Sequence, residues 1–341
     1  MGTALIESSP RSPAVRTPAV AGIASVAAAL PPDRVLNQEI AERIGVSPEW
    51  IVERTGIRER RLAADGASLT ALAAEAGRRA LAAAGADPAS VEMVLVATLT
   101  PDQLLPNTAP LVAGELGIDG AAACDVGAAC TGFMTALSLA AAQVESGRVR
   151  SALVIGADLL SRVTDRTDRK TAALFADGAG AVLITADGPG RIGRTIVRSD
   201  PSASGAIVAG CDERLIRMQG HDVYRAAVGC LSEITLELLA ADGLGIEDVD
   251  LFVYHQANAR ITRAVGERLG LPSERVVDCI AEQGNTGAAT LPLALSHAAA
   301  TGMLRPGDRV LLAATGAGFI YGAGLVEWNG GADTTEHGGV R

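Results

Sequence analysis

Apolar and polar positions follow two periodicities in the middle of the chain, and the same order of elements occurs twice. Residues 68–98 predict an amphipathic helix, a Gly/Asp turn and a short apolar strand. Residues 226–255 predict the same three elements, so that the strand MVLVAT of the first copy corresponds to LFVYH of the second. Thr98 therefore aligns with His255, and the pattern indicates an internal duplication.

The segments that follow these units also match each other. Residues 124–157 and 279–317 each predict a loop, a buried helix that begins at Thr-Gly, a glycine turn and a β-branched strand. Cys130 aligns with Asn285 in this register. Helices that alternate with apolar strands are typical of parallel sheets covered on both faces. We therefore expect a duplicated α/β fold whose halves are related by a pseudo-twofold axis.

The duplication predicts four segments along the chain. They are a flexible leader, a first half, a second half and a flexible tail, at residues 1–18, 19–185, 186–328 and 329–341. A twofold axis between the halves would place Cys130 and Asn285 at equivalent helix N-termini, with His255 at the end of a strand. A thiol, an imidazole and an amide could then share one buried pocket.

Composition excludes several classes of protein. Apolar residues make up 48% of the chain and aromatic residues only 3%, which predicts a core of Ala, Val, Leu and Ile. A net charge of −10 argues against non-specific binding of nucleic acid. The longest uncharged run, 310–326, contains four glycines and predicts buried strands rather than a membrane span. The first residues lack the pattern of a signal peptide, so we expect a cytoplasmic protein without membrane attachment.

Cysteine usage points to a reducing compartment and to one reactive thiol. The cysteines form no CxxC pair and no Cys/His cluster with the spacing of a metal site, so no metal is expected. Cys130, in DVGAACTGF, is either a small core residue or a nucleophile whose thiolate the following helix stabilises. The polar Asn285 at the matching position favours the nucleophile.

Two further residues admit a structural and a catalytic interpretation. His255 ends an apolar strand, but polar residues follow it at the carboxyl end of the strand, where ligand sites form. Asn285, in EQGNTGAAT, is either an N-cap for the next helix or an amide donor beside the thiol. The segment ATGAGFIYGAG predicts a tight turn, whose backbone N–H groups could form an oxyanion hole together with that of Cys130.

The segment WIVERTGIRERR combines an aromatic ring with several guanidinium groups. Its members are Trp50, Arg54, Arg58, Arg60 and Arg61. Such a run of charge usually covers a solvated face. On an acidic protein it also suits a nucleotide, because the ring can stack on adenine and the guanidinium groups can hold phosphates.

The motifs together resemble the β-ketoacyl-acyl carrier protein synthase III family of the thiolase superfamily, from about residue 20 to residue 328. They are WIVERTGIRERR, DVGAACTGF, TDR, LFADGAGAVL, MQGHDVYRAAV, HQANARI, GNTGAAT and GAGFIYGAG. The resemblance implies a thiolase-like fold of five αβαβα layers, usually assembled as a homodimer. It also separates the Cys-His-Asn set of this chain from relatives that resemble Cys-His-His or Cys-His-Cys plans.

The resemblance assigns roles to individual residues. Cys130 accepts the acyl group, His255 and Asn285 serve decarboxylation, and the backbone N–H groups of Cys130 and Ala317 form the oxyanion hole. The residues implied for coenzyme A and its pantetheine arm are Trp50, Arg54, Arg169, Arg225 and Asn258. The implied carrier-protein face consists of Arg260 and Arg268. Leu105 and Thr315 stand where aromatic residues are common around the acyl pocket, Leu105 at a position often supplied by the dimer partner.

The implied reaction is a decarboxylating Claisen condensation, which starts fatty acid or polyketide synthesis. An acyl-CoA would acylate Cys130, and malonyl-acyl carrier protein would then give a 3-ketoacyl-acyl carrier protein, with no metal or redox cofactor. One alternative is an acyltransferase that moves the acyl group without condensation, although Asn285 would then have no enolate to stabilise. The other alternative is a catalytically silent partner of a second ketosynthase. Such a partner is expected to lack the catalytic Cys or His, whereas this chain has both.

Overall fold

Two mixed β-sheets form the framework of the molecule, whose computed structural model describes residues 19–332. The first sheet has the strand order β14-β1-β7-β6-β4-β5, and the second has the order β11-β12-β13-β8. The first sheet contains β1 (Ala21–Ala29), β4 (Met93–Ala97), β5 (Ala122–Val126), β6 (Ser151–Leu159), β7 (Asp177–Ala186) and β14 (Gly331–Ala332). The second sheet contains β8 (Arg191–Ser199), β11 (Leu251–Tyr254), β12 (Arg309–Gly316) and β13 (Ile320–Glu327).

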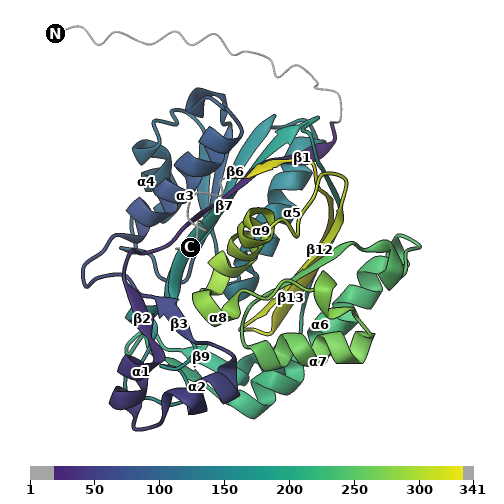
Figure 1. The fold of residues 1–341 in the computed structure, drawn as a ribbon. Helices are drawn as coiled ribbons and strands as arrows, with labels where there is room; N and C mark the ends of the chain where they lie inside the picture. Colours follow the sequence, from purple (N-terminus) through teal and green to yellow (C-terminus); the bar gives the residue numbers. More distant parts are fainter. Residues whose placement is uncertain (1–18, 333–341) are drawn as a thin grey trace, which may run out of the picture.

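Helices form three layers around the two sheets. The helices are α3 (Leu69–Ala83), α4 (Thr108–Glu115), α5 (Gly132–Glu145), α6 (Gly220–Ala241), α7 (Ala259–Leu269) and α9 (Thr290–Ala300). α5 and α9 lie between the sheets and contact strands of both, whereas α3 packs on the outside of the first sheet and α6 on the outside of the second (Figure 1). A helix buried between two sheets must be apolar on most of its surface, as the alanine- and leucine-rich α9 is. The five αβαβα layers expected from the resemblance are confirmed.

The strand orders confirm the internal duplication. Along the first sheet the order β1-β7-β6-β4 is repeated in the second as β8-β13-β12-β11. β5 pairs with β4 in parallel, and a parallel bridge between Phe252 and Val276 takes the corresponding place beside β11. The junction of the halves, expected near residue 185, falls between the end of β7 and the start of β8.

The expectation of parallel sheets is wrong for one strand in each sheet. β4, β5 and β6 are parallel, as are β11 and β12, but β7 and β13 run antiparallel to their neighbours. β12 and β13 are joined by the short turn 317–319, which is too short for a crossover and forces an antiparallel pair. The chain also returns from β6 to β7 without a crossover α-helix.

The two copies differ in where the buried helix begins. α5 begins at Gly132, directly after the 3₁₀ turn η2 (Ala129–Thr131), as the Thr-Gly pattern predicts. α9 begins only at Thr290, after a second 3₁₀ turn, η7 (Gly287–Ala289). Gly287 has φ +60°, which lies in the left-handed region and cannot continue a right-handed helix.

The ends of the described chain also differ from the expectation. β14 pairs in parallel with β1, through Ser25 and Gly331, so ordered structure continues past residue 328, where the tail was expected to begin. The expected leader, 1–18, lies outside the described residues, as does the rest of the tail. Within residues 19–332, no helix is both long and apolar enough to cross a membrane.

Smaller elements complete the molecule beside the two sheets. They are β2 (Arg34–Leu36), α1 (Asn37–Ile44), α2 (Pro48–Thr55), β3 (Glu59–Arg61), β9 (Ile207–Ala209), β10 (Ile216–Met218) and α8 (Ile280–Gln283). α1, α2 and the β2-β3 pair form a small unit at one end of the molecule (Figure 1). Trp50 on α2 and Ile207 on β9 both line the cavity described next.

Candidate active site

Cys130, His255 and Asn285 line one cavity of about 830 Å³. They come from three elements: η2, the residue after β11, and the loop between α8 and η7. η2 and η7 contact each other, as expected of equivalent segments at a pseudo-twofold axis. The structure therefore brings together the thiol, imidazole and amide that the duplication predicts.

The nucleophile loop packs against the C-terminal end of β12. A Cβ on Gly316 would lie 2.8 Å from the backbone nitrogen of Cys130, so only glycine permits this approach. Ala129, immediately before Cys130, has φ 47° and turns the chain sharply into η2. Ala317 follows Gly316 and also lines the cavity. The backbone N–H of Cys130 interacts with the sulfur of the same residue and favours the thiolate. The same N–H group can donate to an oxyanion that forms beside the sulfur.

The Cys130 thiol is protonated in the resting site. Removal from water and, to a smaller extent, the negative charge of Asp158 together raise its pKa to about 12, against the opposing effect of the backbone N–H. The backbone N–H at the helix start thus favours the thiolate, but desolvation outweighs this effect in the resting site. The partial charge of a helix end stabilises by about 1 kcal/mol, which does not offset the loss of hydration.

His255 is a buried neutral base. Its backbone N–H donates to the carbonyl of Ala313 over 2.8 Å, which holds it at the end of β11. The side chain is 2% exposed, and burial lowers its pKa to about 4. Its Nδ1 atom has no hydrogen-bond partner among the described residues. At neutral pH the imidazole can accept a proton at one nitrogen and donate one from the other.

Asn285 combines both interpretations that the sequence allows. Its Oδ1 accepts a hydrogen bond from the backbone N–H of Gly287 over 3.0 Å, as a helix cap does. Its backbone is held on both sides, by Leu174 O at 3.0 Å and by the N–H of Ala176 at 2.8 Å. With Oδ1 used in this way, the Nδ2 amide group remains as a donor at the cavity wall.

Trp50 and two arginines lie at the side of the cavity formed by α2. The guanidinium of Arg54 lies 5.4 Å from the centre of the Trp50 ring, and both residues line the cavity. Arg169 also lines it, but its Nε and Nη2 donate to Ile44 O at 2.7 Å and Gly45 O at 3.0 Å. Arg169 therefore also fixes the C-terminus of α1.

The rest of the WIVERTGIRERR arginines do not form one cluster. Arg60 is fully buried, donates to Asn37 Oδ1 and Ala173 O, and has a pKa lowered to about 10 by burial. Arg61 donates to Pro32 O over 2.7 Å. Of the four arginines in this motif, only Arg54 lines the cavity.

Asn258 and Arg260 lie at the start of α7, on the cavity wall. Asn258 Nδ2 donates to Arg54 O over 3.1 Å, and its Oδ1 accepts from the N–H of Arg260 at 2.9 Å, so Asn258 caps α7 and joins it to α2. The guanidinium of Arg260 lies 5.7 Å from the ring centre of Tyr224. Both ends of the Asn258 amide are thus already engaged.

Three residues assigned by the resemblance do not line the cavity of this chain. Arg225 is exposed and paired with Asp222 at 3.0 Å, and Arg268 is exposed in the last turn of α7. Leu105 is 81% exposed. Thr315 does line the cavity, and its Oγ1 is buried with no partner among the described residues.

The structure also shows features that the sequence analysis does not identify. β9 and β10 supply an apolar part of the lining through Ile207, Val208, Ile216 and Met218. The charge of Asp158 acts on the Cys130 thiol, and Asp158 is recognisable in the sequence as the only charged residue in the buried strand SALVIGADL. No cluster of potential metal ligands occurs in the part of the chain that the structure describes.

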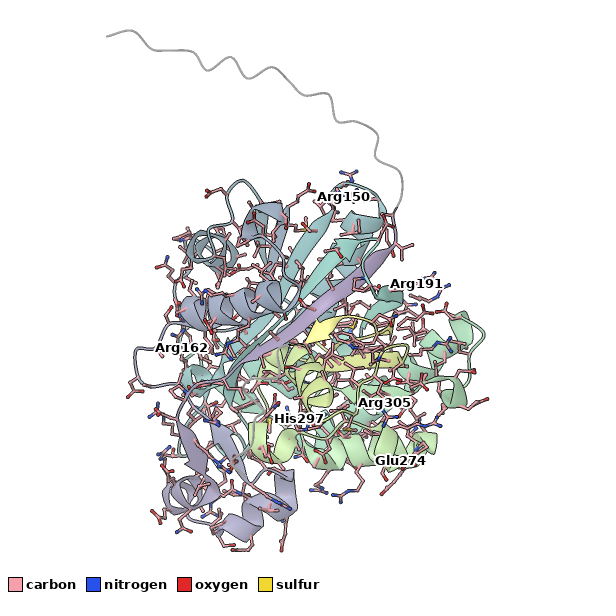
Figure 2. All side chains as sticks on the ribbon, turned by 45° about the horizontal axis from the view of Figure 1, so that its top comes forward. Arg150, Arg162, Arg191, Glu274, His297 and Arg305 are labelled. Carbon is pink, nitrogen blue, oxygen red and sulfur yellow. The ribbon has the colours of Figure 1, made fainter. Side chains whose placement is uncertain are left out.

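The other histidines occupy different settings. His221 is exposed and lines the cavity at the start of α6. His297 lies on α9 (Figure 2) and does not line the cavity. The labelled Arg150, Arg191 and Glu274 lie at the periphery of the molecule (Figure 2). Among the described histidines, His255 alone is buried at the cavity wall.

Comparison with known proteins identifies the family. A family model for 3-oxoacyl-[acyl-carrier-protein] synthase III matches residues 124–201, and the model for its C-terminal part matches residues 239–328. The β-ketoacyl-[acyl-carrier-protein] synthase III of Rhizorhabdus wittichii is 41% identical over 314 residues, which is 88% of this chain and 97% of the relative. The synthase III 2 of Streptomyces coelicolor is 44% identical over 90% of this chain and 94% of its own length.

Solved structures agree with these sequence relatives. The 3-oxoacyl-[acyl-carrier-protein] synthase III of Aquifex aeolicus superposes with a TM-score of 0.88 at 38% identity, over 90% of this chain and 100% of that one. The priming β-ketosynthase from the R1128 polyketide pathway gives a TM-score of 0.88 at 35% identity, over 92% and 98%. The chain therefore belongs to the β-ketoacyl-acyl carrier protein synthase III family of enzymes.

Proposed function

We propose that this enzyme condenses an acyl-CoA primer with malonyl-acyl carrier protein, with loss of CO₂, to give a 3-ketoacyl-acyl carrier protein. The convergence of Cys130, His255 and Asn285 on one cavity is the observation that carries the proposal. A thiol provides the covalent carrier, and two neutral donors suit an enolate that develops only during decarboxylation. The product would begin fatty acid or polyketide synthesis.

Acylation of Cys130 is the first half-reaction. The sulfur attacks the thioester carbonyl, and the S–H proton passes to neutral His255, because the pKa of the thiol lies far above neutral. The backbone N–H groups of Cys130 and Ala317 stabilise the tetrahedral oxyanion. The C–S bond to coenzyme A then breaks, and the leaving thiolate takes the proton from His255. The site is left with a neutral imidazole and an acyl-Cys130.

Decarboxylation and condensation form the second half-reaction. An N–H of His255 and the Nδ2 group of Asn285 donate to the thioester oxygen of malonyl-carrier protein. The bond to the carboxylate breaks, CO₂ leaves, and the electron pair forms an enolate that these donors stabilise. The enolate carbon attacks the carbonyl carbon of acyl-Cys130, the C–S bond to Cys130 breaks, and the departing thiolate takes a proton from solvent. No metal or redox cofactor enters either half-reaction.

The cavity wall suits coenzyme A, and α7 suits an acidic carrier protein. Trp50 and Arg54 already form a ring–guanidinium pair at the wall, next to Arg169. Arg260 and Arg268 are both exposed on α7, where they form a local positive surface on a chain of net charge −10. Charge complementarity of this kind accelerates encounter with an anionic partner.

We also propose a homodimer formed through the free edge of β5. β5 is the last strand of its sheet, and one face of it is exposed at Ala122 and Cys124. Leu104 and Leu105, in the segment before α4, are 74% and 81% exposed. An unpaired edge beside exposed leucines is a typical surface for strand addition between copies.

We further propose a cytoplasmic, reducing location, which the five free cysteines support.

Two measurements test the proposed reaction. After incubation with a panel of acyl-CoAs, intact-protein and peptide mass spectrometry should place one acyl group on Cys130, and none on Cys130→Ser. The acylated enzyme should then release CO₂ from malonyl-carrier protein. Acylation without CO₂ release would indicate a non-condensing acyltransferase. An acyl group found on Cys124 or Cys211 instead of Cys130 would show that Cys130 is not the nucleophile.

A further inference from the structure

Asp158 is a buried carboxylate that the mechanism above does not use. It is the penultimate residue of β6 and is 0% exposed. Its Oδ1 accepts hydrogen bonds from Leu99 N at 2.7 Å, Thr98 Oγ1 at 3.1 Å and Thr100 Oγ1 at 3.3 Å. These three donors belong to the segment after β4, in the first half of the molecule.

The second carboxylate oxygen crosses to the other half. Asp158 Oδ2 accepts a hydrogen bond of 2.8 Å from the backbone N–H of Ala288, in η7. A Cβ on Gly287 would collide with this oxygen, so the glycine is what lets η7 approach β6. Asn285 directly precedes this turn, and its Oδ1 is bonded to Gly287. A single carboxylate therefore joins the first half to the loop that carries the catalytic amide.

Asp158 also influences Cys130 electrostatically. Its negative charge raises the pKa of the Cys130 thiol, after the larger effect of desolvation. Burial in turn raises the pKa of Asp158 to about 6, although its four hydrogen-bond donors favour the ionised form. The carboxylate thus contacts the turn that follows Asn285 and acts on the nucleophile through its charge.

We propose that Asp158 is a positioning residue for the condensation step, which holds the Asn285 amide in register with Cys130 across the junction of the two halves. The role rests on the proposed function. It predicts a specific defect, because acylation does not use the Asn285 amide whereas decarboxylation does. A displacement of about 1 Å at a catalytic group costs on the order of 100-fold in rate.

Asp158→Asn tests the contact with little change in volume. The Oδ1 atom of the new asparagine would still accept from the three donors of the first half. Its Nδ2 group would then face the backbone N–H of Ala288, so two donors would oppose each other and the hydrogen bond to η7 would be lost. We expect the condensation kcat to fall about 10- to 100-fold, with acylation of Cys130 within about threefold of the wild type. The KM for malonyl-carrier protein should stay unchanged. Equal loss of both half-reactions, or normal condensation, would overturn the proposal.

The pH dependence of Cys130 alkylation gives a second readout that needs no substrate. Loss of the Asp158 charge should make Cys130 react faster with iodoacetamide in Asp158→Asn than in the wild type. The ratio should be near 1 below pH 6, where Asp158 is protonated in the wild type, and should increase above it. A ratio that does not change with pH would overturn the electrostatic part of the proposal. Peptide mass spectrometry separates Cys130 from the exposed Cys124 and Cys211.

Two further variants keep the test decisive. Asp177→Asn is the matched control, because Asp177 is equally buried and accepts from Ser161 and Ala63, but does not bond to η7. It should change neither half-reaction selectively. If Asp158→Asn does not fold, Thr98→Val removes one donor to Asp158 and should give a smaller loss in condensation alone. Wild-type enzyme that releases no CO₂ would refute the proposed function, and the alkylation ratio would still test the charge effect.

Discussion

At the scale of single residues, the Cys130 thiol and the His255 imidazole are both uncharged in the resting site. Burial raises the pKa of Cys130 to about 12 and lowers that of His255 to about 4. A neutral thiol and a neutral imidazole avoid the cost of burying an ion pair in an apolar cavity. The charged forms then arise only transiently, when the Cys130 proton moves to His255.

The first prediction concerns His255→Ala. Wild-type acylation should be nearly independent of pH from about 5 to 8, because His255 is deprotonated above pH 4 and serves as the base. In the variant, Cys130 must lose its proton to solvent. Since the pKa of the thiol is about 12, the acylation rate should rise by up to about tenfold per pH unit, and less steeply near pH 6, where ionisation of Asp158 raises the pKa of the thiol.

Condensation by His255→Ala should fall about 100-fold or more at every pH. The variant lacks the imidazole N–H that donates to the enolate oxygen, and a change of pH does not restore this donor. Single-turnover acylation and CO₂ release, each measured from pH 5 to pH 8, distinguish the two effects. Acylation that is fast and independent of pH in the variant would show that Cys130 is ionised without His255.

The second prediction separates the two functions of Asn285. Asn285→Asp keeps the Oδ1 acceptor for Gly287 N but replaces the amide donor with a carboxylate oxygen. The fold and acylation should be preserved, while condensation should fall at least about 100-fold, because a negative charge would face the developing enolate. If this variant condenses normally, Asn285 is only a cap. Asn285→Ala, which loses both functions, should also lower the Tm.

At the scale of elements, turns and strand ends decide which residues reach the cavity. The duplication was predictable because apolar periodicity and the Thr-Gly pattern recur in sequence, and it places Cys130 and Asn285 together. Arg60 could not be placed in this way, because whether an arginine in a short strand points inward depends on its partner Asn37 from another element. The mixed strand directions follow from turn lengths that apolar periodicity does not encode.

The third prediction concerns α2 and the coenzyme A wall. Arg54→Ala should raise the KM for acyl-CoA about tenfold, the scale of one charged hydrogen bond, with little change for a short acyl thioester that lacks the nucleotide. Arg58→Ala is the matched control, because Arg58 is exposed three residues after α2 and does not line the cavity. The effect of Arg54→Ala should weaken at high salt.

Arg169→Ala should behave differently from Arg54→Ala. Arg169 donates to Ile44 O and Gly45 O, so its loss should lower the Tm as well as raise the KM for acyl-CoA. Steady-state kinetics with both thioesters and a thermal melt measure these effects. Equal loss on the two thioesters by Arg54→Ala would contradict a role at the nucleotide.

At the scale of the whole molecule, the acyl pocket raises the question of a second copy. Thr315 lines the cavity of its own chain, whereas Leu105 is 81% exposed and does not. A residue so exposed can influence an acyl chain only if another molecule brings it to a cavity. Assembly through the edge of β5 would cover Leu105, and it would make acyl selectivity a property of the dimer.

The last prediction tests this arrangement with size-selective variants. Thr315→Phe and Leu105→Phe should both shift preference toward acetyl-CoA over butyryl-CoA, by about 10- to 200-fold in kcat/KM. Cys124→Asp places a negative charge on the exposed face of β5, and like charges facing each other across a twofold axis oppose pairing. Light scattering should show a dimer for the wild type and a monomer for Cys124→Asp. Cys211→Asp, at another exposed cysteine, should remain a dimer.

The decisive comparison is between single and double variants. In the Cys124→Asp background, Leu105→Phe should no longer change the acyl preference, because no partner presents the ring to the cavity. Thr315→Phe should still change it, since Thr315 belongs to the same chain. Coupling between Cys124 and Leu105, without coupling between Cys124 and Thr315, would be the signature of a pocket shared by two copies. If Leu105→Phe acts equally in monomer and dimer, Leu105 reaches the acyl chain within its own subunit and the shared pocket is refuted.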